Sequence, residues 1–169
     1  MRKNEEISNL QLPLQLQLAH SYIFTHYLKL TQAQTEPEAE HIRSFVKSIS
    51  NTIPDNRFAN LARALEKSLA HGAPAKDIVD ITYYSWVLTY ETLCASLRPQ
   101  AHSSDQANVA QTELKKYAQK YSLKTELGVA ISAFMLVTLA LAALAIAFIP
   151  ATAALISNVN NILCGSAMG

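Results

Sequence analysis

The chain has 169 residues, a length typical of a single domain. Half of the residues are hydrophobic and only 16% are charged, below the roughly 25% of an ordinary globular chain. The formal net charge of +1 argues against a nucleic-acid partner, because binding to phosphate backbones requires clustered lysine and arginine.

The first helix is predicted over residues 13–32. Leu14, Leu18 and Tyr22 recur at helical spacing, and Pro13 is compatible with a first helical turn. The stretch at residues 10–18 is interrupted by three glutamines, which make it too polar for the apolar core of a signal peptide. We therefore expect a helix here and no cleaved signal peptide.

The next two helices have recognisable ends. Residues 35–38 read Thr-Glu-Pro-Glu, a capping box with proline in the first turn, which predicts a helix that ends before Pro54. Asp55 is expected to cap the following helix, whose apolar residues repeat at i, i+3, i+4 and i+7. Gly72 is expected to stop that helix.

Two more helices complete the charged part of the chain. Pro74 opens a helix that runs to residue 97, and a polar linker at residues 98–104 separates it from a helix that reaches Tyr121. Short loops favour antiparallel neighbours. The sequence therefore predicts an all-α fold, a small helical bundle of four to five helices, in a first domain at residues 1–126.

The remaining residues, 127–169, carry no formally charged side chain and form the second predicted domain. Seventeen of the 19 residues from 131 to 149 are apolar. A helix over residues 127–149 is long enough to cross a hydrocarbon core of about 30 Å, because each residue rises about 1.5 Å. The sequence therefore predicts a C-terminal membrane span. Its large apolar members include Leu127, Ile131, Phe134, Leu136, Leu139, Leu141, Leu144, Ile146, Phe148 and Ile149.

Basic and aromatic residues flank the predicted span on its N-terminal side. The positive-inside rule then places the first domain in the cytosol and predicts a membrane protein. The flanking residues are Lys115, Lys116, Tyr117, Lys120, Tyr121 and Lys124.

Pro150 is expected to break the helix after the span. Residues 151–164 have one apolar face, which fits an amphipathic or re-entrant segment, so a single transmembrane helix and a helical hairpin both remain open. Ala143, Ala147 and Ala151 form a series of small residues that would allow homo-oligomers. The competing interpretation of the tail is a buried helix of a water-soluble bundle. The sequence favours it less, because few residues remain to cover such a helix.

No catalytic motif occurs, so the sequence predicts no enzyme, no cofactor and no metal site. Glu38 and His41 form a single Glu-x-x-His pair, whereas di-iron bundles use two. Cys94 and Cys164 lie on either side of the apolar segment and are not expected to form a disulfide. Four aromatic residues of the fourth helix are interpreted either as a partner-binding surface or as core. They are Tyr83, Tyr84, Trp86 and Tyr90.

Two functions are favoured by these features, and an enzyme in the helical bundle is a third, less favoured alternative. The first is a non-enzymatic, membrane-anchored helical protein whose cytosolic bundle binds a protein partner. The alternative is a membrane-inserting or pore-forming protein that uses residues 127–163 as an Ala-rich hydrophobic hairpin. This layout resembles that of pore-forming colicin domains, although no motif is shared, and it also resembles small secreted effectors of intracellular bacteria. The expected partners are therefore a lipid bilayer and an unidentified protein.

Overall fold

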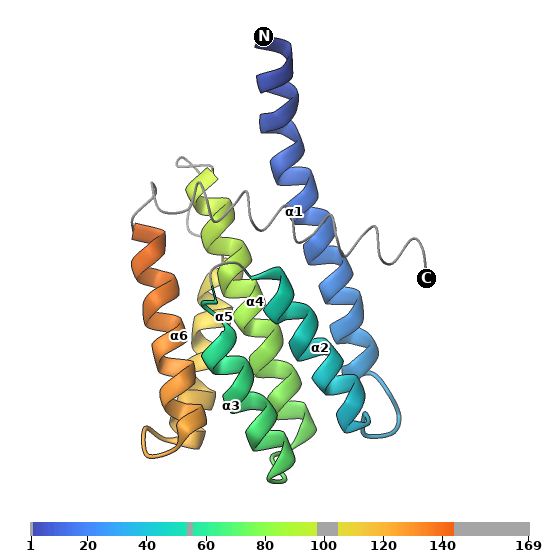
Figure 1. Ribbon diagram of the computed structural model, residues 1–169, viewed down its shortest axis with the longest axis vertical. Helices are drawn as coiled ribbons and strands as arrows, with labels where there is room; N and C mark the ends of the chain where they lie inside the picture. Colours follow the sequence, from blue (N-terminus) through green and yellow to red (C-terminus); the bar gives the residue numbers. More distant parts are fainter. Residues whose placement is uncertain (1, 54–55, 98–104, 144–169) are drawn as a thin grey trace.

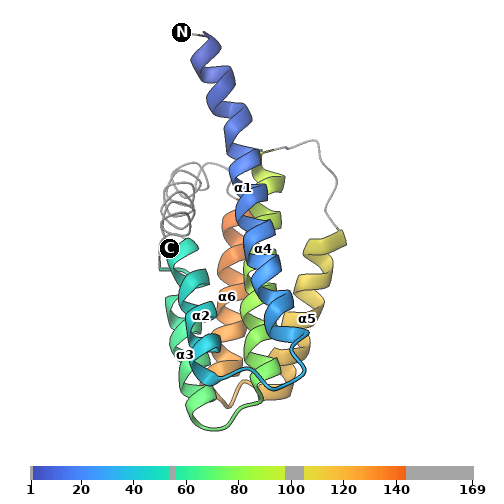
Figure 2. The same ribbon diagram turned by 90° about the vertical axis from the view of Figure 1, so that its right-hand side faces the viewer.

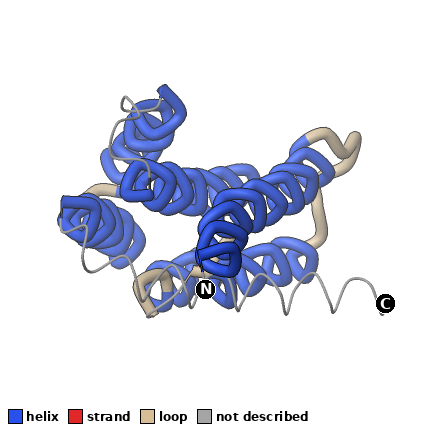
Figure 3. Tube along the Cα trace, turned by 90° about the horizontal axis from the view of Figure 1, so that it is seen from above, coloured by secondary structure: helices blue, strands red, loops and turns tan. Residues whose placement is uncertain are grey.

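The computed structural model describes residues 2–53, 56–97 and 105–143. These residues form six α-helices and no strand (Figure 1, Figure 3). The prediction of an all-α bundle is confirmed, with a further helix formed by the start of the uncharged tail. The helices are α1 (Arg2–Thr31), α2 (Ala39–Thr52), α3 (Ala59–Ala70), α4 (Ala75–Leu97), α5 (Asp105–Tyr121) and α6 (Glu126–Ala143).

Helix α4 lies at the centre of the bundle and contacts each of the other five described helices (Figure 2). Its apolar side chains are buried on several sides, since Ile81, Trp86 and Leu88 have no measurable exposure. An apolar surface all round is typical of a helix at the middle of a bundle. The remaining helices therefore position their side chains against α4.

Four buried hydroxyl side chains lie on α4 among these apolar residues. Thr82 Oγ1 donates a hydrogen bond to the Ile78 carbonyl at 2.7 Å, one helical turn earlier. Ser85, Thr89 and Thr92 make the same bond to their own helix. A buried hydroxyl is costly only when it lacks a hydrogen bond, so these bonds within the helix allow α4 to carry the four groups in the core.

Helix α1 packs on the bundle through its C-terminal half. Leu16, Ala19 and Ile23 are at most 5% exposed and form the buried stripe. The N-terminal part of the helix projects beyond the other helices (Figure 1, Figure 2). The helix starts at Arg2 rather than at Pro13, because the apolar repeat used for the prediction marks only its packed part.

The start of α2 differs from the prediction. Glu38 is the N-cap residue, with an extended ψ of 144° and no side-chain cap hydrogen bond. The box at residues 35–38 required Glu36 to be helical, and a residue that precedes proline avoids the helical region. Thr35 and Glu36 therefore belong to the α1–α2 loop.

The end of α3 confirms the predicted glycine stop. Gly72 has a φ of +90°, in the left-handed region that glycine adopts at little cost. The helix itself starts at Ala59, and Phe58 is its N-cap residue. The predicted cap, Asp55, lies outside the described residues.

Helix α6 is formed by the start of the uncharged tail and packs against α3, α4 and α5 (Figure 1). Leu127, Ile131 and Phe134 are at most 3% exposed and belong to the hydrophobic core. Within the described ranges, no helix has both the length and the apolarity needed to cross a membrane. The predicted membrane span and membrane localisation are therefore wrong, because side chains that were expected to contact lipid contact the protein core instead.

The rest of the predicted span and the residues beyond it lie outside the described part of the chain. They are Leu144, Ile146, Ala147, Phe148, Ile149, Pro150, Ala151 and the remainder of residues 151–164.

Candidate functional site

Two buried carboxylates lie at the start of α4. Asp77 and Asp80 are about one helical turn apart, so they project from the same side of the helix. Each is only 6% exposed. Their hydrogen-bond partners come from α1 and α5. We call the whole group the tyrosine–aspartate cluster: Tyr27, Asp77, Asp80, Tyr117, Lys120 and Tyr121.

Asp80 accepts one phenolic hydrogen bond on each of its oxygens. The Tyr27 hydroxyl donates to Asp80 Oδ1 at 2.8 Å, and the Tyr117 hydroxyl donates to Asp80 Oδ2 at 2.8 Å. Burial, followed by the hydrogen bond to Asp80, raises the pKa of both phenols above its ordinary value. Both hydroxyls therefore keep their protons at neutral pH and act as donors.

Asp77 has one cationic and one phenolic partner, both from α5. Lys120 Nζ lies 2.6 Å from Asp77 Oδ2, and the Tyr121 hydroxyl donates to the same oxygen at 2.7 Å. The cluster therefore joins α1 and α5 to the first two turns of α4. It holds two carboxylates and a single cation, so a negative charge remains at this end of the helix.

The sequence interpretation did not find this cluster. Tyr117, Lys120 and Tyr121 were assigned to a membrane flank, whereas the structure places them against Asp77 and Asp80. The sequence did contain the two patterns that form the cluster. Two acidic residues lie three positions apart on an apolar helix, and a later helix carries Tyr, Lys and Tyr at i, i+3 and i+4. Spacing shows that each set shares a helix face, but it does not show which two faces meet.

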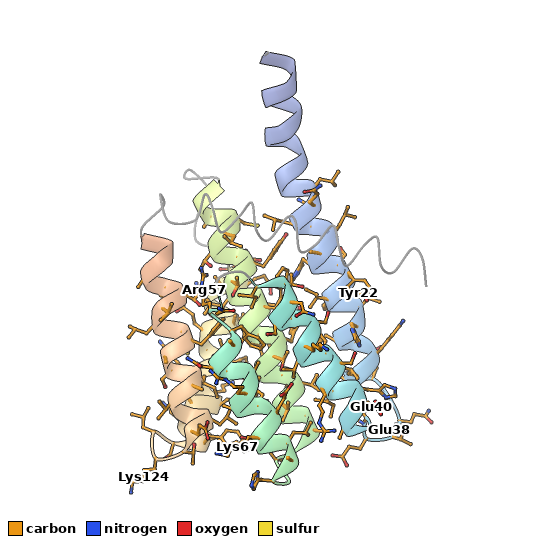
Figure 4. All side chains as sticks on the ribbon, in the orientation of Figure 1. Tyr22, Glu38, Glu40, Arg57, Lys67 and Lys124 are labelled. Atoms are coloured by element: carbon orange, nitrogen blue, oxygen red, sulfur yellow. The ribbon has the colours of Figure 1, made fainter. Side chains whose placement is uncertain are left out.

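The other residues of the predicted flank lie on the surface. Lys115, Lys116 and Lys124 are exposed. Lys116 Nζ pairs with Glu113 Oε1 at 3.0 Å along α5. Lys124 lies in the α5–α6 loop and points away from the bundle (Figure 4). For Lys115 and Lys124, no carboxylate of the described residues lies within ion-pair distance.

The four aromatic residues interpreted as a partner surface or as core lie mostly inside the bundle. Tyr83, Trp86 and Tyr90 are at most 9% exposed, and Tyr84 is half-buried. The Tyr83 ring stacks on Tyr27 of α1, with ring centroids 3.9 Å apart. These aromatic side chains form the contact between α1 and α4, and three of them are not accessible to a partner.

His20 of α1 joins this aromatic contact through a polar bond. The Trp86 Nε1–H donates to His20 Nδ1 at 3.2 Å, and the His20 ring stacks on Tyr90 with centroids 4.3 Å apart. The bond requires an unprotonated Nδ1. Burial lowers the pKa of His20, and the nearby Glu91 carboxylate opposes this effect. The neutral imidazole is therefore the form that fits the packed structure.

Two hollows open on the surface near these elements. The α4 pocket, of about 360 Å³, lies between the α1–α2 loop and the start of α4 and includes Asp80 in its wall. The α5–α6 groove, of about 440 Å³, runs between the last turns of α5 and the middle of α6. The groove is lined by Lys115, Ala118, Gln119, Ser122, Leu123, Ser132, Met135, Leu136 and Leu139.

The groove is apolar and open to solvent. Leu123 is 70% exposed and Leu136 is 72% exposed, whereas Met135 forms a buried floor. Val129 and Val137 continue the exposed apolar side of α6. The α6 helix therefore has one apolar side in the core and another that no described residue covers.

The residues considered for metal binding do not come together in a site. Glu38 and His41 are both exposed, and the described ranges hold no group of three or more His, Cys, Asp or Glu side chains that could bind a metal ion. Cys94 is half-buried on α4, and Cys164 lies outside the described residues.

No known protein family, no curated protein and no solved structure matches this chain.

Proposed function

We propose that this protein is a non-enzymatic helical protein that binds a partner protein, and that it holds an amphipathic helix of that partner in the α5–α6 groove. The observation that carries the proposal is the exposed apolar side of α6. Large apolar side chains that lie together on a surface are typical of interaction sites. Leu123 and Leu136, on opposite sides of the groove, would be the main apolar contacts.

The dimensions of the groove support a helical ligand. One wall runs from residue 115 of α5 to Leu123 of the α5–α6 loop, and the other runs from residue 132 to residue 139 on α6. Along α6, seven steps of about 1.5 Å give a length of about 10 Å, which corresponds to about two turns of a helix. A ligand helix would then present apolar side chains at i, i+3 or i+4, and i+7.

The charges beside the groove support an acidic flank on the partner helix. Lys115 lines the groove, and Lys124 directly follows Leu123. Neither lysine is paired with a carboxylate of the described residues, so both ammonium groups are available to a ligand. Glutamates along the edges of the partner helix would complement them, and complementary charge favours correct orientation and rapid association.

The test uses the full-length chain and a fluorescent synthetic peptide helix with leucines at i, i+4 and i+7 and glutamates on both flanks. Fluorescence anisotropy is expected to show saturable binding. Leu136→Glu should weaken binding about tenfold or more, because it removes a central apolar contact and places a like charge beside the peptide glutamates. Leu14→Glu is the matched control, because Leu14 is also exposed but lies on α1.

A second arm tests the charge complementarity. Lys115→Glu should weaken binding of the glutamate-flanked peptide and strengthen binding of an otherwise identical lysine-flanked peptide. Equal effects of Leu136→Glu and Leu14→Glu would contradict the proposal. A dimer of the full-length chain that Leu136→Glu dissociates would also overturn it, because the groove would then bind a second copy rather than another protein.

A further inference from the structure

The α4 pocket combines an apolar wall with one buried carboxylate. Leu30 and Val79 contribute apolar surface, and Tyr27 and Asp80 lie side by side in the wall. Its volume of about 360 Å³ falls within the range of small-molecule sites. The pocket lies away from the α5–α6 groove, since none of its lining residues belongs to α5 or α6.

Asp80 has no cationic partner among the described residues. The cation of the tyrosine–aspartate cluster, Lys120, pairs with Asp77 instead. Asp80 receives two neutral phenol donors, whereas an ionised carboxylate can accept about four hydrogen bonds. A buried charge is strongly favoured by a partner of opposite sign. The carboxylate therefore has both acceptor capacity and charge to offer to a ligand in the pocket.

The other charged groups at the pocket determine the sign of that ligand. Glu36 adds a second carboxylate at the α1–α2 loop, and Lys76 adds one ammonium at the start of α4. With Asp80, the lining carries two negative charges and one positive charge, so it favours a cation. A metal ion is disfavoured, because the described residues provide no group of three metal-binding side chains.

We propose that the α4 pocket binds a small primary organic amine in its ammonium form. The ammonium group would donate hydrogen bonds to the free acceptor positions of Asp80, and an alkyl or aryl body would lie against Leu30 and Val79. The hydroxyls of Tyr27 and Tyr117 hold the Asp80 carboxylate in place through their two hydrogen bonds. Charge-assisted hydrogen bonds of this kind are stronger than neutral ones.

The experiment compares three probes that share a phenyl ring and differ in the charge of the attached group, on the full-length, isotope-labelled protein: benzylammonium, benzyl alcohol and benzoate. In titrations followed by NMR, benzylammonium should bind saturably and shift amide signals of residues 33–36 and 75–80. Benzyl alcohol should bind about 10- to 100-fold more weakly, since it lacks the charge that Asp80 recognises. Benzoate should not bind in this pocket.

Variants locate the site. Asp80→Asn keeps the shape of the side chain but replaces one carboxylate oxygen with an NH2 group and removes the charge, and it should weaken benzylammonium binding about 10- to 100-fold. Ala33→Trp, at an exposed loop position in the pocket wall, should block binding without removing any core side chain. Glu40→Gln is the control, because Glu40 is exposed on α2 and does not line the pocket (Figure 4).

Three results would overturn the proposal: no saturable binding of benzylammonium, equal affinity for benzyl alcohol, or shifted signals outside the pocket. Unchanged binding by Ala33→Trp would do the same, and this variant keeps the test decisive if Asp80→Asn fails to fold. Leu136→Glu, which alters the α5–α6 groove, should leave amine binding unchanged. The test of the amine site is therefore independent of the test of the proposed protein-binding function.

Discussion

Lys120 and Lys124 are four residues apart, yet the fold uses them differently. Lys120 bonds to Asp77 at 2.6 Å, whereas Lys124 points into solvent from the α5–α6 loop (Figure 4). From the sequence alone, both lysines are expected in the basic flank of a membrane span. Only the side chain that meets a buried carboxylate contributes to the stability of the bundle, because exposed charges are solvated equally well in the unfolded chain.

Lys120→Met is expected to lower the free energy of unfolding by about 1–2 kcal/mol, because Asp77 would keep only its bond to Tyr121. Lys124→Met is the matched control and should leave that free energy unchanged. Urea unfolding followed by circular dichroism measures both variants. Equal losses in the two variants would show that the Lys120–Asp77 pair does not stabilise the fold.

The two half-buried histidines of α1 predict a dependence of stability on pH. Burial is the main cause that lowers the pKa of both His20 and His26 below the ordinary value of 6.5. Between the lowered pKa and 6.5, the unfolded chain therefore binds more protons than the folded chain, and stability rises with pH. Their contribution is complete above about pH 6.5 and is lost as the pH falls through the lowered values.

Urea unfolding at a series of pH values on both sides of 6.5 measures this effect. The fluorescence of Trp86, the only tryptophan in the chain, reports the contact with His20 directly. His20→Gln should reduce the loss of stability on acidification, because a side chain that does not titrate replaces one that does. An unchanged pH dependence in this variant would show that His20 is not a source of the effect.

At the scale of helices, the turn between α5 and α6 depends on one close approach. A Cβ atom added at Gly128 would lie 1.9 Å from the Ser122 carbonyl oxygen, which is backbone and cannot move aside alone. Ser122 itself has a φ of +62°, in the left-handed region. Thr125 Oγ1 accepts a hydrogen bond from the Gly128 N–H at 3.2 Å and so caps α6. The turn therefore fixes how α6 enters the bundle.

Gly128→Ala is expected to destabilise the protein by about 3 kcal/mol or more, because overpacking against backbone forces the two helices apart. Gly72→Ala is the comparison: its φ of +90° is strained for alanine, but a Cβ there has open space around it. That variant should cost about 1 kcal/mol. Thermal unfolding of both proteins gives the difference, and similar losses would contradict a steric role for Gly128.

The helices could be predicted where their signals are local. The amphipathic pattern of α3 and its glycine stop specify a helix without knowledge of its neighbours. The surroundings of α6 could not be predicted in the same way, because a helix that is apolar on all sides is compatible both with lipid and with the interior of a bundle. Which of the two applies depends on whether other helices offer a matching face, and Phe134 meets Phe58 of the α2–α3 connection at a centroid distance of 5.9 Å.

The sites were harder to predict than the helices. The tyrosine–aspartate cluster requires α1, α4 and α5 to meet at one end, and each helix alone carries only part of it. The α5–α6 groove could not be predicted for a different reason. Leu136 and Phe134 are both apolar, and the sequence does not show that Leu136 is exposed while Phe134 is buried. Periodicity identifies faces, and only packing decides which face remains uncovered.

For the whole molecule, the central position of α4 predicts an order of protection from hydrogen exchange. Amides of α4 should exchange most slowly, because α4 contacts every other described helix and opens only when the bundle unfolds. Amides in the part of α1 that projects beyond the bundle should exchange fastest (Figure 1). Mass spectrometry of exchanged, digested protein measures this order. Equal protection of the two regions would contradict the packing described for α1.

The side-chain hydrogen bonds between α4 and its neighbours have a mechanical consequence for the whole bundle. At its first two turns, α4 is joined to α1 and α5 by directional bonds from Tyr27, Tyr117 and Lys120. Farther along, Ser85 and Thr89 bond back to their own helix, whereas Trp86 donates a hydrogen bond to His20 of α1. Directional bonds therefore join α1 to α4 at two separate levels, at Asp80 and at Trp86. Sliding of α1 along α4 would have to break both bonds at once.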